Sequence, residues 1–233
     1  MQPAWISAVD LTSLDRSKET KESIQILCEK ALRLQTACVC IYPEHIQAAK
    51  RNPGLTVATV VSFPDGMDSQ CEVVASVARA IADGVDEIDV VWDYTAFNEN
   101  RLADAVKPIE WTKAAVRACG AQGIRVKVIL ETGAIKQDRL ANACELVLQT
   151  FDDAATIWFL KTSTGKKGYE GATVHSAKTM LESIKCAGKM HNVGLKVSGG
   201  VKTVEQAQMY SSLAESFGCG LFRIGASSLL DAF

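Results

Sequence analysis

The sequence predicts an α/β protein folded as a single (β/α)8 TIM barrel that takes up residues 1–233. Eight short apolar segments alternate with segments of helical spacing, and this alternation favours parallel strand pairing. The length of 233 residues is close to the ~250 that are typical of such a barrel. An open, doubly wound sheet is the alternative, but it would carry a glycine-rich turn after the first strand. This chain has Asp10-Leu11-Thr12-Ser13 there.

The expected strands are short runs in which β-branched and other apolar residues dominate. They lie at residues 4–9, 37–42, 56–63, 87–92, 125–131, 156–162, 193–198 and 221–225. Between them, apolar residues recur with the spacing of amphipathic helices. These helices are expected at residues 16–34, 44–52, 70–83, 101–119, 136–150, 173–187 and 203–217.

Two helix starts carry capping signals. Asp68 and Ser69 precede the helix expected from residue 70, and Thr203 and Gln206 have the spacing of a capping box. No linker, low-complexity run or repeat interrupts the chain. We therefore expect one domain.

Composition excludes several classes of protein. With 48% hydrophobic residues, the chain lacks the low hydrophobicity of a disordered protein. Twenty-five Lys and Arg against 27 Asp and Glu give a net charge of −2, which argues against a basic nucleic-acid surface. No apolar stretch approaches the ~20 residues of a membrane span, and the amino terminus lacks a basic signal-peptide region. We expect neither a nucleic-acid nor a membrane partner.

The eight cysteines contain no C-x-x-C pair, and most lie within apolar helix or strand patterns. At this chain length they indicate reduced, buried thiols in a cytoplasmic protein. With only three histidines, none adjacent to Cys38 or Cys40, we expect no metal site. Cys40 belongs either to the core or to the pocket wall, since a shift by one pleat reverses its orientation.

Charged residues occur within the strand patterns, where a barrel is normally apolar. Strand alternation directs Asp89, Lys161 and Lys196 to defined strand faces, near the ends where barrel enzymes keep their chemistry. If Lys161 and Lys196 lie on neighbouring strands at one height, each disfavours the other's charge. A free amine is what carbonyl attack and Schiff-base formation require, and Asp89 could then move protons.

Each of these residues also has a structural explanation. A lone strand lysine is usually an ion-pair partner or reaches out to water from a rim. We assign Lys127 and Glu87 to such pairing within the barrel, and we assign no sharper role to Glu131. Two lysines and one aspartate together favour a catalytic site.

Glycine and hydroxyl residues follow the last three strands. Ser163-Thr164-Gly165-Lys166, Gly199-Gly200 and Gly225-Ala226-Ser227-Ser228 lie at these positions. Small residues allow backbone amides to approach an anion, and barrel phosphate sites are often built from the loops after strands seven and eight. Ordinary βα turns are the alternative. Three such loops together favour a phosphate site.

Three motifs resemble those of the deoxyribose-phosphate aldolases. Residues 159–166 (FLKTSTGK) resemble the family's Schiff-base lysine motif, 193–200 (VGLKVSGG) its second-lysine motif and 86–91 (DEIDVV) its catalytic-aspartate strand. Further similarity extends over almost the whole chain. It includes Asp10-Leu11-Thr12, Cys40-Ile41-Tyr42-Pro43, Phe63-Pro64-Asp65-Gly66, Glu131-Thr132-Gly133 and Gly225-Ala226-Ser227-Ser228.

This resemblance implies reversible cleavage of 2-deoxy-D-ribose 5-phosphate into D-glyceraldehyde 3-phosphate and acetaldehyde, without metal or cofactor, in deoxyribonucleotide catabolism. It implies that Lys161 is the nucleophile, that Asp89 relays protons and that Lys196 holds down the pKa of Lys161. The resemblance also implies that Asp10 and Thr12 support Lys196. It implies a homodimer as the assembly. The residues implied for phosphate binding are Gly165, Lys166, Gly199, Gly200, Ser227 and Ser228.

The chain departs from the family pattern at Trp92-Asp93 and Val197-Ser198, and it stops at Phe233. Some members carry a C-terminal tail whose terminal tyrosine reaches the active site, and that tail is missing from this sequence.

Three other functions stay open. One is another lysine-dependent sugar-phosphate aldolase, such as a transaldolase-like enzyme. The second is a non-catalytic phosphate-binding barrel, and the third is a metal-dependent aldolase, against which the lack of a histidine cluster argues.

Overall fold

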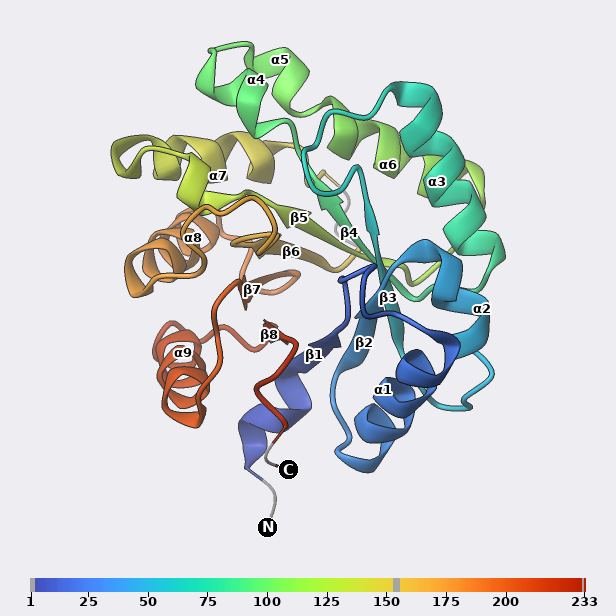
Figure 1. The fold of residues 1–233 in the computed structure, drawn as a ribbon. Helices are drawn as coiled ribbons and strands as arrows, with labels where there is room; N and C mark the ends of the chain where they lie inside the picture. Colours follow the sequence, from blue (N-terminus) through green and yellow to red (C-terminus); the bar gives the residue numbers. More distant parts are fainter. Residues whose placement is uncertain (1–2, 153–155, 232) are drawn as a thin grey trace.

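The computed structural model describes residues 3–152, 156–231 and 233. Its strands form a closed barrel in chain order (Figure 1), and every neighbouring pair is parallel, including the pair of first and last strands that closes it. The predicted (β/α)8 barrel is confirmed. The strands are β1 Val9–Thr12, β2 Cys38–Ile41, β3 Val57–Val61, β4 Glu87–Val91, β5 Arg125–Ile129, β6 Trp158–Lys161, β7 Val193–Ser198 and β8 Phe222–Ala226.

The helices lie outside this barrel (Figure 1). They are α1 Lys21–Arg33, α2 Ile46–Ala49, α3 Gln70–Ala82, α4 Tyr94–Asn98, α5 Leu102–Ala105, α6 Lys107–Ala118, α7 Leu140–Gln149, α8 Val174–Cys186 and α9 Val204–Ser216. Both predicted caps are confirmed: Ser69 forms a capping box with Glu72 at the start of α3, and Thr203 forms one with Gln206 at the start of α9. In the described residues, no helix combines the length and the apolar character that a membrane crossing demands.

The first expected strand was wrong in position. Residues Ala4–Ala8 form a 3-10 helix, and the extended chain begins only at Val9. Trp5 and Ile6 are adjacent in sequence and both buried, which the two-residue alternation of a half-buried strand does not provide. Asp10 and Thr12 therefore lie within β1 rather than in a turn after it.

The helix expected at 101–119 is divided into α5 and α6. Pro108 lies in the first turn of α6, where its missing amide proton costs nothing, although within a continuous helix it would remove a hydrogen bond. The short helix α4 was not predicted. Asp93 caps it, because its carboxylate accepts a hydrogen bond from the Ala96 amide at 2.8 Å.

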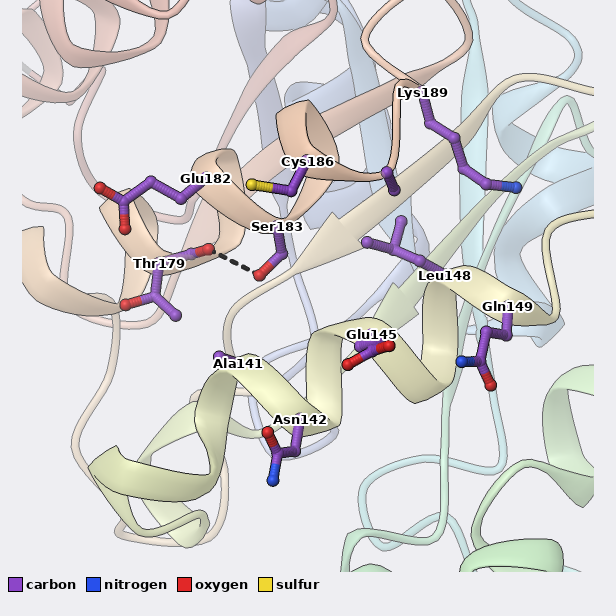
Figure 2. Close-up of a pocket in the computed structure, with 11 residues that line it drawn as sticks. Ala141, Asn142, Glu145, Leu148, Gln149, Thr179, Glu182, Ser183, Cys186 and Lys189 are labelled. Carbon is purple, nitrogen blue, oxygen red and sulfur yellow. Dashed lines mark hydrogen bonds between the residues drawn. The ribbon is translucent and has the colours of Figure 1, made fainter.

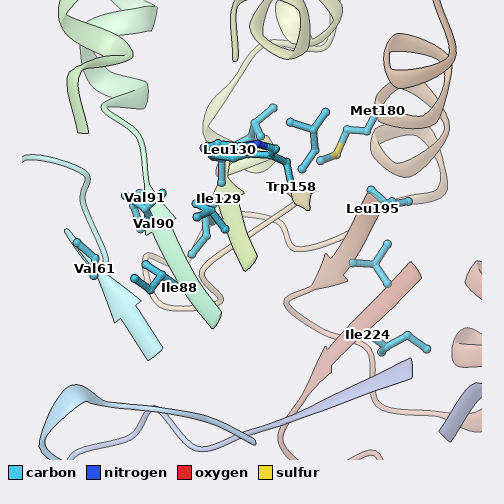
Figure 3. Close-up of a cluster of buried hydrophobic side chains, with 14 of the residues drawn as sticks. Val61, Ile88, Val90, Val91, Ile129, Leu130, Trp158, Met180, Leu195 and Ile224 are labelled. Carbon is cyan, nitrogen blue, oxygen red and sulfur yellow. The ribbon is translucent and has the colours of Figure 1, made fainter. Parts of the chain in front are cut away.

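Strand residues divide between two environments. Ile88, Val90, Leu195 and Ile224 belong to the large apolar cluster that also includes helix residues such as Met180 (Figure 3). The other strand face looks into the barrel. There the register pairs Asp89 with Lys127, Lys161 with Lys196, and Lys196 with Arg223. Since paired residues point to the same face of a sheet, the charged residues gather inside the barrel.

Candidate active site

Lys161, Lys196 and Asp89 meet inside the barrel. Lys161 is the last residue of β6 and pairs in register with Lys196 of β7. The Nζ atoms of both lysines lie 2.8 Å from Oδ2 of Asp89 on β4. Lys161 is 3% exposed, and the other two residues are 0% exposed. The predicted meeting of these three residues is confirmed, and their catalytic roles stay predictions.

The environment of Lys161 favours the free amine. Burial lowers the pKa of Lys161 below its ordinary value, and the charge of Lys196 lowers this pKa further, against the opposing effect of Asp89. We expected the neighbouring cation to be the cause. Burial is the larger cause, since removing an ammonium group from water disfavours its charge.

Lys196, by contrast, keeps its proton. Burial opposes its charge, but the carboxylates of Asp10 and Asp89, at 2.6 and 2.8 Å, outweigh burial and raise the pKa of Lys196. The predicted neighbourhood of Asp10 and Lys196 is confirmed. The Thr12 hydroxyl donates to the backbone carbonyl of Asp10 at 2.9 Å, so Thr12 contacts the strand that carries Asp10.

The surroundings of Asp89 favour its carboxylate form. Burial opposes its charge, but Lys127, Lys161 and Lys196 together hold the pKa of Asp89 well below its usual range. Lys127 Nζ lies 2.7 Å from Asp89 Oδ1 and 2.7 Å from Glu87 Oε2. The predicted pairing of Lys127 with Glu87 is therefore confirmed, and Lys127 also binds the candidate catalytic carboxylate.

Arg223 was not singled out from the sequence. Its Nη1 donates to Asp10 at 2.9 Å, and its Nη2 donates to Glu87 at 3.2 Å. Alternation in β8 places Arg223 on the same face as Gly225, which pairs with Asp10 across the barrel closure. The sequence alone predicts this alternation, but it does not predict the register of β8 with β1.

Cys40 faces the barrel interior. It is 0% exposed, and its Sγ lies 3.9 Å from Asp89 Oδ2. Burial, followed by the charge of Asp89, raises the pKa of the Cys40 thiol. A protonated thiol is a poor nucleophile, so the free amine of Lys161 is the stronger candidate for carbonyl attack.

The six residues predicted to bind phosphate follow three adjacent strands, β6, β7 and β8. The loops after β6 and β7 are in contact, because a Cβ atom on Gly171 would lie 1.8 Å from the Gly199 carbonyl oxygen. Gly199 and Gly200 have φ values of +81° and +90°, which favour glycine. Lys166, Ser227 and Ser228 are exposed. Phosphate binding by these six residues stays a prediction.

Glu131 supports the loop after β6. It is 2% exposed and has a left-handed φ of +53°. Its carboxylate accepts hydrogen bonds from the Thr164 amide at 3.1 Å and from the Thr164 hydroxyl. The same hydroxyl accepts from the Lys166 amide at 3.2 Å. Glu131 thereby links the end of β5 to the loop that carries Gly165 and Lys166.

One group of described residues has the spacing of metal ligands. Ligand atoms of Asp10, Cys38 and Glu87 lie within 4.8 Å of one another. However, the two carboxylates already contact Lys127, at 3.4 and 2.7 Å, and both accept from Arg223. Because these cations neutralise the carboxylates and repel another positive charge, the group is better suited to ion pairing than to a metal.

A cavity of about 570 Å³ lies outside the barrel, between α7 and α8 (Figure 2). Asn142 and Glu145 line it from α7, and Thr179 and Cys186 line it from α8. None of the predicted site residues is among its lining residues.

Comparison with known proteins gives a family match over nearly the whole chain. The family described as DeoC/LacD family aldolase matches residues 4–233. A solved structure of a candidate deoxyribose-phosphate aldolase from Coccidioides immitis is 27% identical, with a TM-score of 0.83. That match covers 99% of this chain and 86% of that one.

Two further structures share the fold. An aldolase called QR15 is 24% identical with a TM-score of 0.81, and the match covers 97% of this chain and 92% of that one. A deoxyribose phosphate aldolase from Aeropyrum pernix, described as having a unique tetrameric structure, is 23% identical with a TM-score of 0.72. That match covers 97% of this chain and 88% of that one.

Proposed function

Since the chain belongs to the DeoC/LacD aldolase family, we propose that it is a class I aldolase with Lys161 as its Schiff-base nucleophile. Its proposed reaction is the reversible cleavage of 2-deoxy-D-ribose 5-phosphate into D-glyceraldehyde 3-phosphate and acetaldehyde. The observation that carries this proposal is a buried lysine with a lowered pKa, within 2.8 Å of a carboxylate, at the end of β6. An uncharged amine at that place has the lone pair that attack on a carbonyl requires.

In the proposed reaction, Lys161 Nζ attacks C1 of the open-chain sugar and forms a carbinolamine. Loss of water gives an iminium ion, which accepts the electron pair of the C2–C3 bond as that bond breaks. The C3 hydroxyl loses its proton, and C3 becomes the aldehyde carbon of glyceraldehyde 3-phosphate. Protonation of the enamine at C2 and hydrolysis then release acetaldehyde and restore the amine.

The proton transfers are assigned to Asp89 together with Lys196. The Asp89 carboxylate accepts hydrogen bonds from Lys161 and Lys196, both at 2.8 Å. It can therefore position a proton donor beside the oxygen of the carbinolamine. Lys196 remains protonated beside Asp10 and favours the neutral form of Lys161. The loops after β6, β7 and β8 are proposed to bind the phosphate through Gly165, Gly199, Gly200 and neighbouring side chains.

The test is a substrate panel followed by product analysis. Acetaldehyde and glyceraldehyde 3-phosphate released in equal amounts from 2-deoxyribose 5-phosphate, with chelator present, would support the proposal. Cleavage of a different sugar phosphate would favour another lysine-dependent aldolase, an alternative that the breadth of the family description supports. Binding of phosphate without cleavage of any sugar would favour a non-catalytic barrel.

The cellular setting belongs to the same proposal. The proposed reaction would serve deoxyribonucleotide catabolism in the cytoplasm. A homodimer is our expectation for the assembly, and light scattering on the purified protein tests it.

A further inference from the structure

The ion pairs around Asp89 continue to the opposite end of the barrel. Lys127 connects Asp89 to Glu87 and Asp10, and Arg223 binds both of these carboxylates from β8. We call Asp10, Glu87, Asp89, Lys127, Lys161, Lys196 and Arg223 the barrel cluster. Arg223 lines a cavity of about 450 Å³ together with Trp5 of the amino-terminal 3-10 helix and Phe222, the first residue of β8. The cluster therefore reaches from the candidate nucleophile to the amino-terminal end of the strands.

Without a proton on Lys161, the barrel cluster is electrically balanced. Its three carboxylates, Asp10, Glu87 and Asp89, are matched by the three cations Lys127, Lys196 and Arg223. A proton on Lys161 would add a fourth positive charge for which the cluster holds no further carboxylate. Because an unbalanced buried charge is costly, this balance favours the neutral amine.

Two other charged side chains lie beside the cluster, one of each sign: Arg125 contacts Glu87, and Glu131 interacts electrostatically with Lys161. Cys38 and Cys40 on β2 are neutral thiols, since burial raises the pKa of each. On β3, the inward residues are Ala58 and Val60. Arg125 on β5 contacts Glu87 at 2.8 Å with its side chain 38% exposed. Glu131, after the carboxyl end of β5, has its pKa raised by burial, against the opposing effects of its hydrogen bonds to Thr164 and of the Lys161 charge.

We propose that Arg223 is a positioning residue that keeps the Lys161 amine uncharged, by neutralising Asp10 and Glu87 from the far end of the barrel. This inference rests on the proposed role of Lys161 as nucleophile. Without the guanidinium, the cluster would carry one uncompensated negative charge, and protonation of Lys161 would cancel it.

Arg125 provides a matched control. It also donates to Glu87, and it lines the same cavity. Its side chain is 38% exposed, whereas that of Arg223 is 14% exposed, so water screens Arg125 more strongly. Loss of Arg125 should therefore disturb Lys161 much less than loss of Arg223.

The experiment measures the protonation of Lys161 without turnover. The intact protein is labelled briefly with acetic anhydride at a series of pH values, and peptide mass mapping compares Lys161 with the exposed Lys202. In Arg223→Gln, the labelling midpoint of Lys161 should move about one pH unit upward. It should stay near the wild-type midpoint in Arg223→Lys and in Arg125→Gln.

Two further variants separate electrostatics from loss of structure. Glu87→Gln removes a negative charge, so the midpoint should move downward, a change of sign that general loosening does not predict. In Arg223→Ala, added guanidinium ion should enter the cavity and restore the wild-type midpoint. An unmoved midpoint in Arg223→Gln, or an upward shift in Glu87→Gln, would overturn the inference about Arg223. An ordinary lysine midpoint in the wild-type protein would instead overturn the nucleophile assignment.

Discussion

At the scale of single residues, three lysines surround one carboxylate, and the site depends on the difference between their pKa values. Lys127, Lys161 and Lys196 all lie within 2.8 Å of Asp89. Lys127 also contacts Glu87, and Lys196 also contacts Asp10. These carboxylates outweigh the effect of burial and raise the pKa of both lysines. Lys161 has only Asp89 among the ion pairs of the described chain, and burial lowers its pKa.

A lysine held neutral in this way destabilises the fold. Its folded pKa lies below the ordinary value of 10.5, so the cost is absent above that value and grows as pH falls toward the folded pKa. We therefore expect Lys161→Met to abolish cleavage and to raise the free energy of unfolding at pH 7 by roughly 1–3 kcal/mol. Urea unfolding of both proteins measures this, with Lys127→Met as a control that should be destabilised. A less stable Lys161→Met protein would contradict the account.

At the scale of elements, the loop after β6 is tied to its neighbours by side chains far apart in sequence. Glu131 at the end of β5 binds Thr164, and Lys167 forms an ion pair with Asp65 in the loop after β3. The rings of Tyr94 and Tyr169 also meet edge to face, with centroids 6.2 Å apart. These contacts hold the segment that contains Gly165 and Lys166.

Glu131→Ala should release this segment while leaving Lys161 on its strand. We expect KM for 2-deoxyribose 5-phosphate to rise about tenfold, because the loop loses roughly one hydrogen bond to a charged group that keeps it ordered. KM for unphosphorylated 2-deoxyribose should change less than about twofold. Steady-state kinetics on both sugars measures the difference, and Glu145→Ala on the exposed face of α7 is the control. Equal losses with both sugars would contradict a role in holding the phosphate loop.

At the scale of the whole molecule, the closed barrel gathers charges from six strands into one buried cluster. Asp10, Glu87 and Asp89 have pKa values lowered below their ordinary 3.8 to 4.5, as their cationic partners outweigh burial. Their contribution to stability is present above these ordinary values and is lost as pH falls through the folded values. For the buried thiols of Cys38 and Cys40, burial raises the pKa above 9.0, so their contribution is lost at higher pH.

We therefore expect steep losses of stability below about pH 4.5 and above about pH 9, and between these limits only the decline toward lower pH that Lys161 causes. Thermal unfolding across pH measures these losses. An Asp89→Asn variant should show a shallower acid limb, because one lowered carboxyl group is gone. A wild-type protein equally stable at pH 3 and pH 7 would contradict the ionised cluster.

Much of this architecture could be predicted from periodicity, but the register could not. Alternation within each strand places Lys161 and Asp89 on definite faces, and they can meet inside the barrel because its side-chain layers are drawn from alternate strands, here β4 and β6. The role of Arg223 was not predicted, because its partner Asp10 lies near the other end of the chain and contacts it only when the barrel closes. The role of Glu131 could not be predicted either, since its left-handed φ and its hydrogen bond to Thr164 depend on tertiary packing.

The first segment shows the same limit. Residues Ala4–Ala8 have the composition of a strand, yet they form a 3-10 helix in which Trp5 and Ile6 are both buried. Trp5 packs edge to face on Phe233, with ring centroids 5.9 Å apart. Local propensity gives way here to packing between the two ends of the chain.

The central claim is that Lys161 is a free amine that forms a Schiff base. The most direct measurement is reduction by borohydride in the presence of acetaldehyde, followed by peptide mass mapping, with Lys161→Met as the control. We predict an ethyl adduct confined to the peptide of Lys161 and absent when acetaldehyde is omitted. No adduct, or adducts spread evenly over exposed lysines such as Lys202, would contradict the claim.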